Sequence, residues 1–214
     1  SALERLSEFK AQGISNSMYS LAVLRFQSPQ FLKSVSQHVP ERLEEFSEQE
    51  LTNLIYAMAL LRWREQQVLM STSTHVAASV QRLTPRSIST ALYSLALLDF
   101  RLDAVCSSCC SEASQRLSSF NAQDMSNLIY AMALLEFSHT GLLGALNMEM
   151  LGRLSEFTGQ GLANVVYSLG LLDYWCPPLL RAIADHLPSR WSELSEQHLS
   201  NIAYGFGLLG FLDS

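Results

Sequence analysis

The sequence predicts an all-α protein, an α-solenoid built from about six tandem helix-hairpin repeats of 37 residues. The first observation is a tyrosine that recurs every 37 residues without insertion or deletion, at Tyr19, Tyr56, Tyr93, Tyr130, Tyr167 and Tyr204. The second is that its surroundings recur, with leucine five positions later and an aromatic residue seven positions later in every copy. Self-similarity at a period of about 20–50 residues is typical of repeat proteins.

The segment around each tyrosine is predicted to form the second helix of its repeat. In the first repeat this helix covers about residues 11–25, and its equivalents follow at intervals of 37 residues. Five of the six residues that precede these helices have side-chain oxygens suited to an N-cap. The six are Lys10, Ser47, Thr84, Asn121, Thr158 and Ser195. Pro85 follows Thr84 at the first helical position, where proline is favoured.

A small residue three positions after each tyrosine predicts that these helices approach one another closely. The residues are Ala22, Ala59, Ala96, Ala133, Gly170 and Gly207. The helices are apolar on most sides, which indicates burial between neighbours. The tyrosines are therefore interpreted as internal packing residues.

The remainder of each repeat is predicted to form the first helix. Pro29 and Pro177 share one position in the 37-residue frame, at a plausible helix start. Pro40 and Pro188 share another position, where a proline is expected to end or kink the helix. We expect the leucines at another shared position to face the partner helix: Leu32, Leu69, Leu143 and Leu180.

Composition fits one extended helical protein. Of the 214 residues 48% are hydrophobic and 16% charged, and no linker or low-complexity segment interrupts them. We therefore expect a single helical-repeat array over residues 1–214, as an internal fragment of a longer protein. The apolar runs are too short for a membrane span. The net charge of −6 mildly favours a protein partner.

The sequence predicts no enzyme, with no catalytic residue, metal or cofactor. It contains neither a phosphate-binding glycine loop nor a nucleophile or zinc-protease motif. Cys106 and Cys109 have the C-x-x-C spacing of half a zinc site. They occupy positions that are apolar in other repeats, as Leu32 and Val35 are, so core packing is favoured.

The first candidate binding surface is a column of amides on one face of the second helices. Its members lie four residues apart in each repeat: Gln12 and Asn16, Gln49 and Asn53, Gln123 and Asn127, Gln160 and Asn164, and Gln197 and Asn201. The third repeat has Arg86 and Thr90 instead. Amides can pair with RNA base edges. The alternative is an asparagine ladder that satisfies backbone groups between repeats.

The second candidate is a column of arginines that stacked repeats would align as a phosphate ladder. It comprises Arg5, Arg42, Arg116, Arg153 and Arg190. Four repeats place a glutamate three residues after the arginine, within reach of a helical ion pair. The alternative is therefore an internal arrangement of charges.

The segment FNAQDMSNLIYAMALLEF, residues 120–137, resembles the second helix of octotricopeptide repeats and of the similar 37-residue heptatricopeptide repeats. The resemblance extends along the chain, for example through Phe9, Gln12, Asn16 and Tyr19. It implies an α-solenoid that binds single-stranded RNA, an organellar transcript or ribosomal RNA, in a mitochondrion or plastid. The implied roles are transcript processing or stability, translation and ribosomal RNA assembly. The alternative is a protein-binding scaffold or structural subunit of an organellar ribosome or another large ribonucleoprotein complex.

Overall fold

The computed structural model describes residues 8–211, whose regular elements are all helices. It has eleven α-helices there and no β-strand, which confirms the predicted all-α class of helical repeats. The chain divides into two compact units, residues 1–108 and 109–214, with the boundary inside α6 (Asp103–Gln115). The single array over residues 1–214 stays a prediction.

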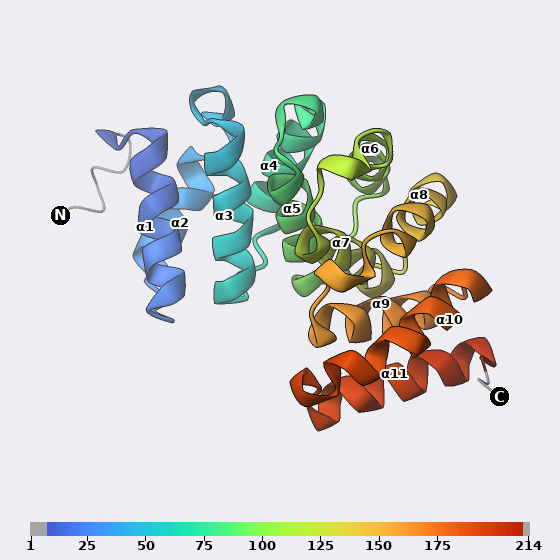
Figure 1. The fold of residues 1–214 in the computed structure, drawn as a ribbon. Helices are drawn as coiled ribbons and strands as arrows, with labels where there is room; N and C mark the ends of the chain where they lie inside the picture. The colour runs from blue at the N-terminus through green and yellow to red at the C-terminus, as the bar shows by residue number, and fades with distance from the viewer. Residues whose placement is uncertain (1–7, 212–214) are drawn as a thin grey trace. The chain divides into compact units, whose positions relative to one another are not determined.

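In the first unit, the second and third repeats each join two α-helices through a short 3-10 turn. The elements are α1 (Ala11–Val23), α2 (Pro29–His38), η2 (Leu43–Glu45), α3 (Glu48–Leu61), α4 (Gln66–Ala78), η3 (Val80–Arg82) and α5 (Pro85–Leu97). The second helices of the repeats are α1, α3 and α5, and they pack side by side (Figure 1). The 3-10 turns were not predicted from the sequence.

The second unit repeats this plan. Its elements are η4 (Leu117–Ser119), α7 (Ala122–Leu134), α8 (Thr140–Leu151), η5 (Leu154–Glu156), α9 (Gly159–Leu171), α10 (Pro177–His186), η6 (Leu187–Glu193) and α11 (Glu196–Leu209). Here α9 packs between α7 and α11, and α8 contacts α10.

The predicted helix starts are confirmed in all six repeats. The side chains of Ser47, Thr84, Asn121, Thr158 and Ser195 each accept a hydrogen bond from a backbone N–H in the first turn, as N-caps do. Ser47 and Glu50 form a complete capping box. Pro29 and Pro177 stand at the first turn of α2 and α10, and these helices end two residues before Pro40 and Pro188.

Each second helix ends in the same way, one or two residues earlier than predicted. The residue after the C-cap, or the C-cap itself, adopts a left-handed conformation with φ between 48° and 63°. These residues are Arg25, Arg62, Asp99, Glu136, Asp173 and Gly210. The next N–H then reaches back to the helix, as from Trp63 to the Met58 carbonyl at 2.9 Å. This is the Schellman motif, and it explains why an aromatic residue recurs just beyond each helix.

The left-handed position yields a stability prediction. Replacing Asp173 by glycine should stabilise the protein by about 1 kcal/mol, because glycine has no Cβ to strain at φ 49° and the change removes an anion from a helix C-terminus. Urea unfolding would measure the gain. Gly210→Ala should destabilise the protein by a similar amount, since Gly210 has φ 63°. Asp173→Asn, which removes only the charge, should give the smaller part of the gain.

The small residues allow the close helix contacts that the sequence predicts, except at Gly207, where an added Cβ would meet no atom within 4 Å. A Cβ added at Gly170 of α9 would lie 2.8 Å from the Cα atom of Gly205 in α11. Ala22, Ala59, Ala96 and Ala133 are all buried. Two backbones can therefore approach only where neither carries a larger side chain.

The four cysteines are buried, as the core interpretation predicts. Burial raises the pKa of Cys176 to about 11 and also raises the pKa of Cys106, which opposes thiolate formation. None of the helices within residues 8–211 combines the length and apolar character needed to cross a lipid bilayer.

Candidate nucleic-acid interface

The predicted amide columns lie on the second helices of each unit. Gln12, Gln49, Gln123, Gln160 and Gln197 are all exposed, while the asparagines are exposed at Asn16 and half-buried at Asn53, Asn127, Asn164 and Asn201. In the first unit they belong to α1 and α3, and in the second unit to α7, α9 and α11. The four-residue spacing places each pair on one face of its helix.

In three repeats the glutamine and the asparagine of the column bond to each other. The Nε2 atom of Gln49 donates to Oδ1 of Asn53 at 2.9 Å, and the equivalent bonds from Gln123 to Asn127 and from Gln197 to Asn201 measure 2.8 Å. Each of these pairs still offers an NH₂ group on the asparagine, and Gln123 and Gln197 also offer an amide oxygen. The amide oxygen of Gln49 accepts a hydrogen bond from the Ser87 hydroxyl at 3.4 Å.

Side chains other than the asparagines bond to backbone groups of the next repeat, the role that the alternative gave to the asparagines. Ser15 donates to the Glu50 carbonyl at 3.0 Å, and Gln27 donates to the Leu61 carbonyl at 2.8 Å. Across residues 8–211, none of the column asparagines donates a side-chain bond to the backbone of a neighbouring repeat. The asparagines therefore remain available on the surface.

The tyrosines share this face, and their interpretation as internal packing residues is wrong. Tyr19 is 45% exposed and Tyr204 is 55% exposed, and the other four are half-buried. The ring centroids of Tyr19 and Tyr56 lie 6.4 Å apart in the first unit. In the second unit Tyr167 lies 6.3 Å from Tyr130 and 6.0 Å from Tyr204. The tyrosines thus form a row on the surface of each unit.

A row of exposed aliphatic side chains continues the face, four residues after each tyrosine. It comprises Val23, Leu60, Leu97, Leu134, Leu171 and Leu208, each 36–58% exposed. The sequence analysis missed this row, although four-residue spacing from the tyrosines could have revealed it. We call the glutamines, asparagines, tyrosines and aliphatic residues of these rows the amide–tyrosine face of their unit.

The predicted arginine column has a different environment. Arg5 lies outside the described residues. Nη2 of Arg42 lies 2.7 Å from Glu45, and Arg190 lies 3.0 Å from Glu193. Arg116 pairs with Glu112 at 2.9 Å, and Arg153 pairs with Glu149 and Glu156 at 2.9 and 2.8 Å. The described arginines of the column therefore form ion pairs within the protein, as the alternative predicts. Contact between the column and RNA phosphates stays a prediction.

These arginines also connect neighbouring repeats within each unit. Arg42 donates to the Phe9 carbonyl at 2.8 Å, and Arg190 donates to the Ser155 carbonyl. The guanidinium of Arg42 holds the pKa of Glu45 below its ordinary value. The backbone N–H of Gly159, 2.8 Å away, and then Arg190 lower the pKa of Glu193. Donors that already bind carboxylates and carbonyls are less free to bind a phosphate.

Repeated helical hairpins with a periodic face of amides and aromatic rings define a helical-repeat protein. The model of one protein family, described as RESC6, RNA-editing substrate-binding complex 6 protein, matches residues 1–214, and the chain belongs to that family. No curated protein matches the chain.

The family match corrects the predicted resemblance to octotricopeptide and heptatricopeptide repeats, which is wrong. The features that carried the resemblance have general structural causes in this fold. The capping residues start a helix, the small residues allow close packing, and the aromatic residue follows a Schellman motif. Any repeat of closely packed helical hairpins can acquire the same features.

Proposed function

We propose that the protein is an RNA-binding subunit of an RNA-editing substrate-binding complex and contacts single-stranded RNA through its amide–tyrosine faces. The description of its family supports the RNA-related part. The observation that carries the proposal is the exposed amide column, repeated in register on α1 and α3 and again on α7, α9 and α11. In this role the protein binds and positions RNA and needs no catalytic group.

The chemistry of the face suits unpaired bases. A side-chain amide offers a donor and an acceptor, which matches the edge of a base, and each base has a π-face that can stack on an aromatic ring. In the face, Tyr56 comes three residues after Asn53 and so presents its ring beside the amide. Base-paired RNA conceals these edges in a deep and narrow groove, so single-stranded RNA is the preferred ligand.

The mitochondrion is the proposed location, as for the RNA-editing complexes after which the family is described. The plastid has no support from the family match.

A protein-binding scaffold is the second candidate. The exposed aliphatic row favours it, because apolar side chains that recur on one face are typical of protein contacts. A subunit of a ribonucleoprotein complex can use one face for RNA and another for protein, so the two roles are compatible.

The test combines ultraviolet crosslinking with alanine variants. Crosslinked peptides of the native protein should map to the second helices. Asn53→Ala and Asn127→Ala should each weaken binding of single-stranded RNA about fivefold or more, because a lost base-edge contact costs at least about 1 kcal/mol. Ser107→Ala, an exposed change on α6, serves as the control and should leave affinity unchanged. Crosslinks to proteins alone, with unchanged RNA affinity in both variants, would favour the scaffold instead.

A further inference from the structure

The net charge of the protein is unevenly distributed between its two units. Residues 1–108 contain ten basic and ten acidic side chains, whereas residues 109–214 contain four basic and ten acidic side chains. The whole net charge of −6 therefore belongs to the second unit. RNA phosphates are repelled by such an excess of carboxylates, and the first unit does not have it.

The left-handed position at the end of each second helix shows the same contrast. In the first two repeats it is Arg25 and Arg62, and in the second unit it is Glu136, Asp173 and Gly210. Asp99, the third residue of the column, bonds to Arg64 at 3.3 Å and is partly neutralised. The position therefore changes from basic to acidic along the chain.

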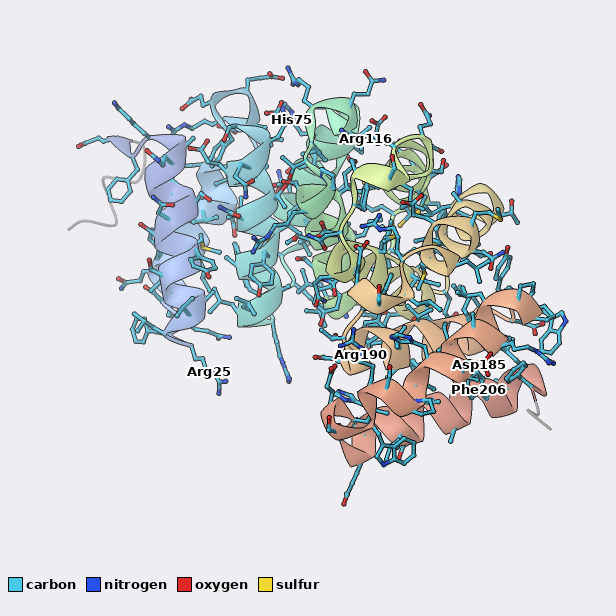
Figure 2. The ribbon with its side chains drawn as sticks, in the orientation of Figure 1. Arg25, His75, Arg116, Asp185, Arg190 and Phe206 are labelled. Carbon is cyan, nitrogen blue, oxygen red and sulfur yellow. The ribbon has the colours of Figure 1, made fainter. Side chains whose placement is uncertain are left out.

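Arg25 and Arg62 have no side-chain partner within residues 8–211, unlike Arg42 and Arg153. Arg25 projects from the end of α1 beyond the ribbon (Figure 2). Both line a cleft of about 440 Å³ together with Ala22, Gln27, Leu60 and Leu61. Leu60 belongs to the amide–tyrosine face, so the cleft joins the arginines to that face.

The Tyr19–Tyr56 pair lies on the same two helices as these arginines. Their ring centroids lie 6.4 Å apart and the rings are inclined by 28°. Unpaired bases stack on aromatic rings, so this pair offers a stacking surface to the bases of a strand whose phosphates reach the arginines.

We propose that the first unit supplies the phosphate contacts of the RNA-binding surface: Arg25 and Arg62 bind two phosphates of a single strand whose bases meet Tyr19, Tyr56 and the neighbouring amides. The inference rests on the proposed RNA-binding function. It adds that the α1–α3 pair supplies the phosphate contacts, whereas Asp173 and Glu136 oppose them at the equivalent positions of the second unit. Affinity then depends on a few phosphates and on stacking.

The dependence of RNA affinity on salt tests the site. Two phosphate contacts predict a slope of log affinity against log salt near −1.4, whereas five arginines in a ladder would give about −3.5. The double variant Arg25→Asn with Arg62→Asn should bring the slope close to zero and weaken binding about 5- to 30-fold. Asparagine tolerates the left-handed conformation, so the fold should be preserved. The probe is a single-stranded oligouridine titrated into the full protein.

Arg181→Gln is the matched control, because Arg181 is an exposed cation on α10 that forms no ion pair or side-chain hydrogen bond in the described residues. It should leave slope and affinity unchanged. If the native protein binds RNA but the double variant keeps both slope and affinity, this site is wrong and the proposed function stands. If the native protein binds no RNA, the proposed function itself fails.

Discussion

Replacing Gly205 with alanine is expected to destabilise the protein by about 1–3 kcal/mol or more, as overpacked interiors generally do. A Cβ at this position would clash with the carbonyl oxygen of Val166 and lie 2.9 Å from the Cα atom of Tyr167. Both atoms belong to the backbone of α9, which cannot turn aside as a flexible side chain can. Helices α9 and α11 would have to separate, and the contacts on both sides of the pair would weaken.

Gly207→Ala is the matched control, because it makes the same chemical change two residues away on the same helix. No atom lies within 4 Å of a Cβ added there. Alanine should therefore stabilise α11 by about 0.5–1 kcal/mol through its higher helix propensity. The measurement is the urea concentration at the midpoint of unfolding, compared between the two variants and the native protein. If the two variants shift the midpoint equally, the close contact between α9 and α11 does not govern the stability of this unit.

Replacing Phe157 with alanine should have the largest effect on stability, a loss of about 3–5 kcal/mol. Phe157 is 1% exposed and stands between η5 and the N-cap of α9, where it is among the largest fully buried side chains. Its removal leaves a cavity that rigid neighbouring helices cannot collapse. Hydrogen exchange should show the loss of protection first in the adjoining helices, since each repeat contacts mainly its neighbours.

Phe26→Ala removes the same side chain from a site where it is 59% exposed. The expected loss there is no more than about 1 kcal/mol, because little apolar surface is uncovered. Equal losses for the two variants, or a uniform loss of exchange protection throughout the chain, would contradict the packing described for Phe157.

The elements of this fold that depend on local interactions were predicted well. The starts of all six second helices were predicted at the residues where they occur, and in five of them the N-cap side chain bonds within its own first turn. The left-handed ends and the 3-10 turns were not predicted, because five of the six left-handed residues are not glycine. The aromatic column was noticed, but only the backbone geometry showed that it follows a Schellman motif.

The candidate site was predicted in part. Four-residue spacing was enough to place Gln49 and Asn53 on one helix face, and both reach the surface. The same reasoning failed for the tyrosines, since a helix that is apolar on most sides does not reveal which side its neighbours leave uncovered. For the arginines, spacing suggested both an ion pair and a phosphate contact. In the structure Arg42 forms the ion pair with Glu45, and it also donates a hydrogen bond to the Phe9 carbonyl of the first repeat.

The amino-acid sequence alone sets the 37-residue repeat, the helix starts and the small residues that allow close packing, because these depend on the chemistry of single positions and their near neighbours. The tertiary structure decides which face of each second helix stays exposed and which cations keep a free guanidinium. Arg153 and Arg25 carry the same side chain, but Arg153 lies between two carboxylates and Arg25 projects from a helix end into a cleft. The carboxylates beside Arg153 lie within four residues of it and follow from local spacing. The cleft at Arg25 is formed with Leu60 and Leu61 of the next repeat, so packing between elements distant in sequence creates it.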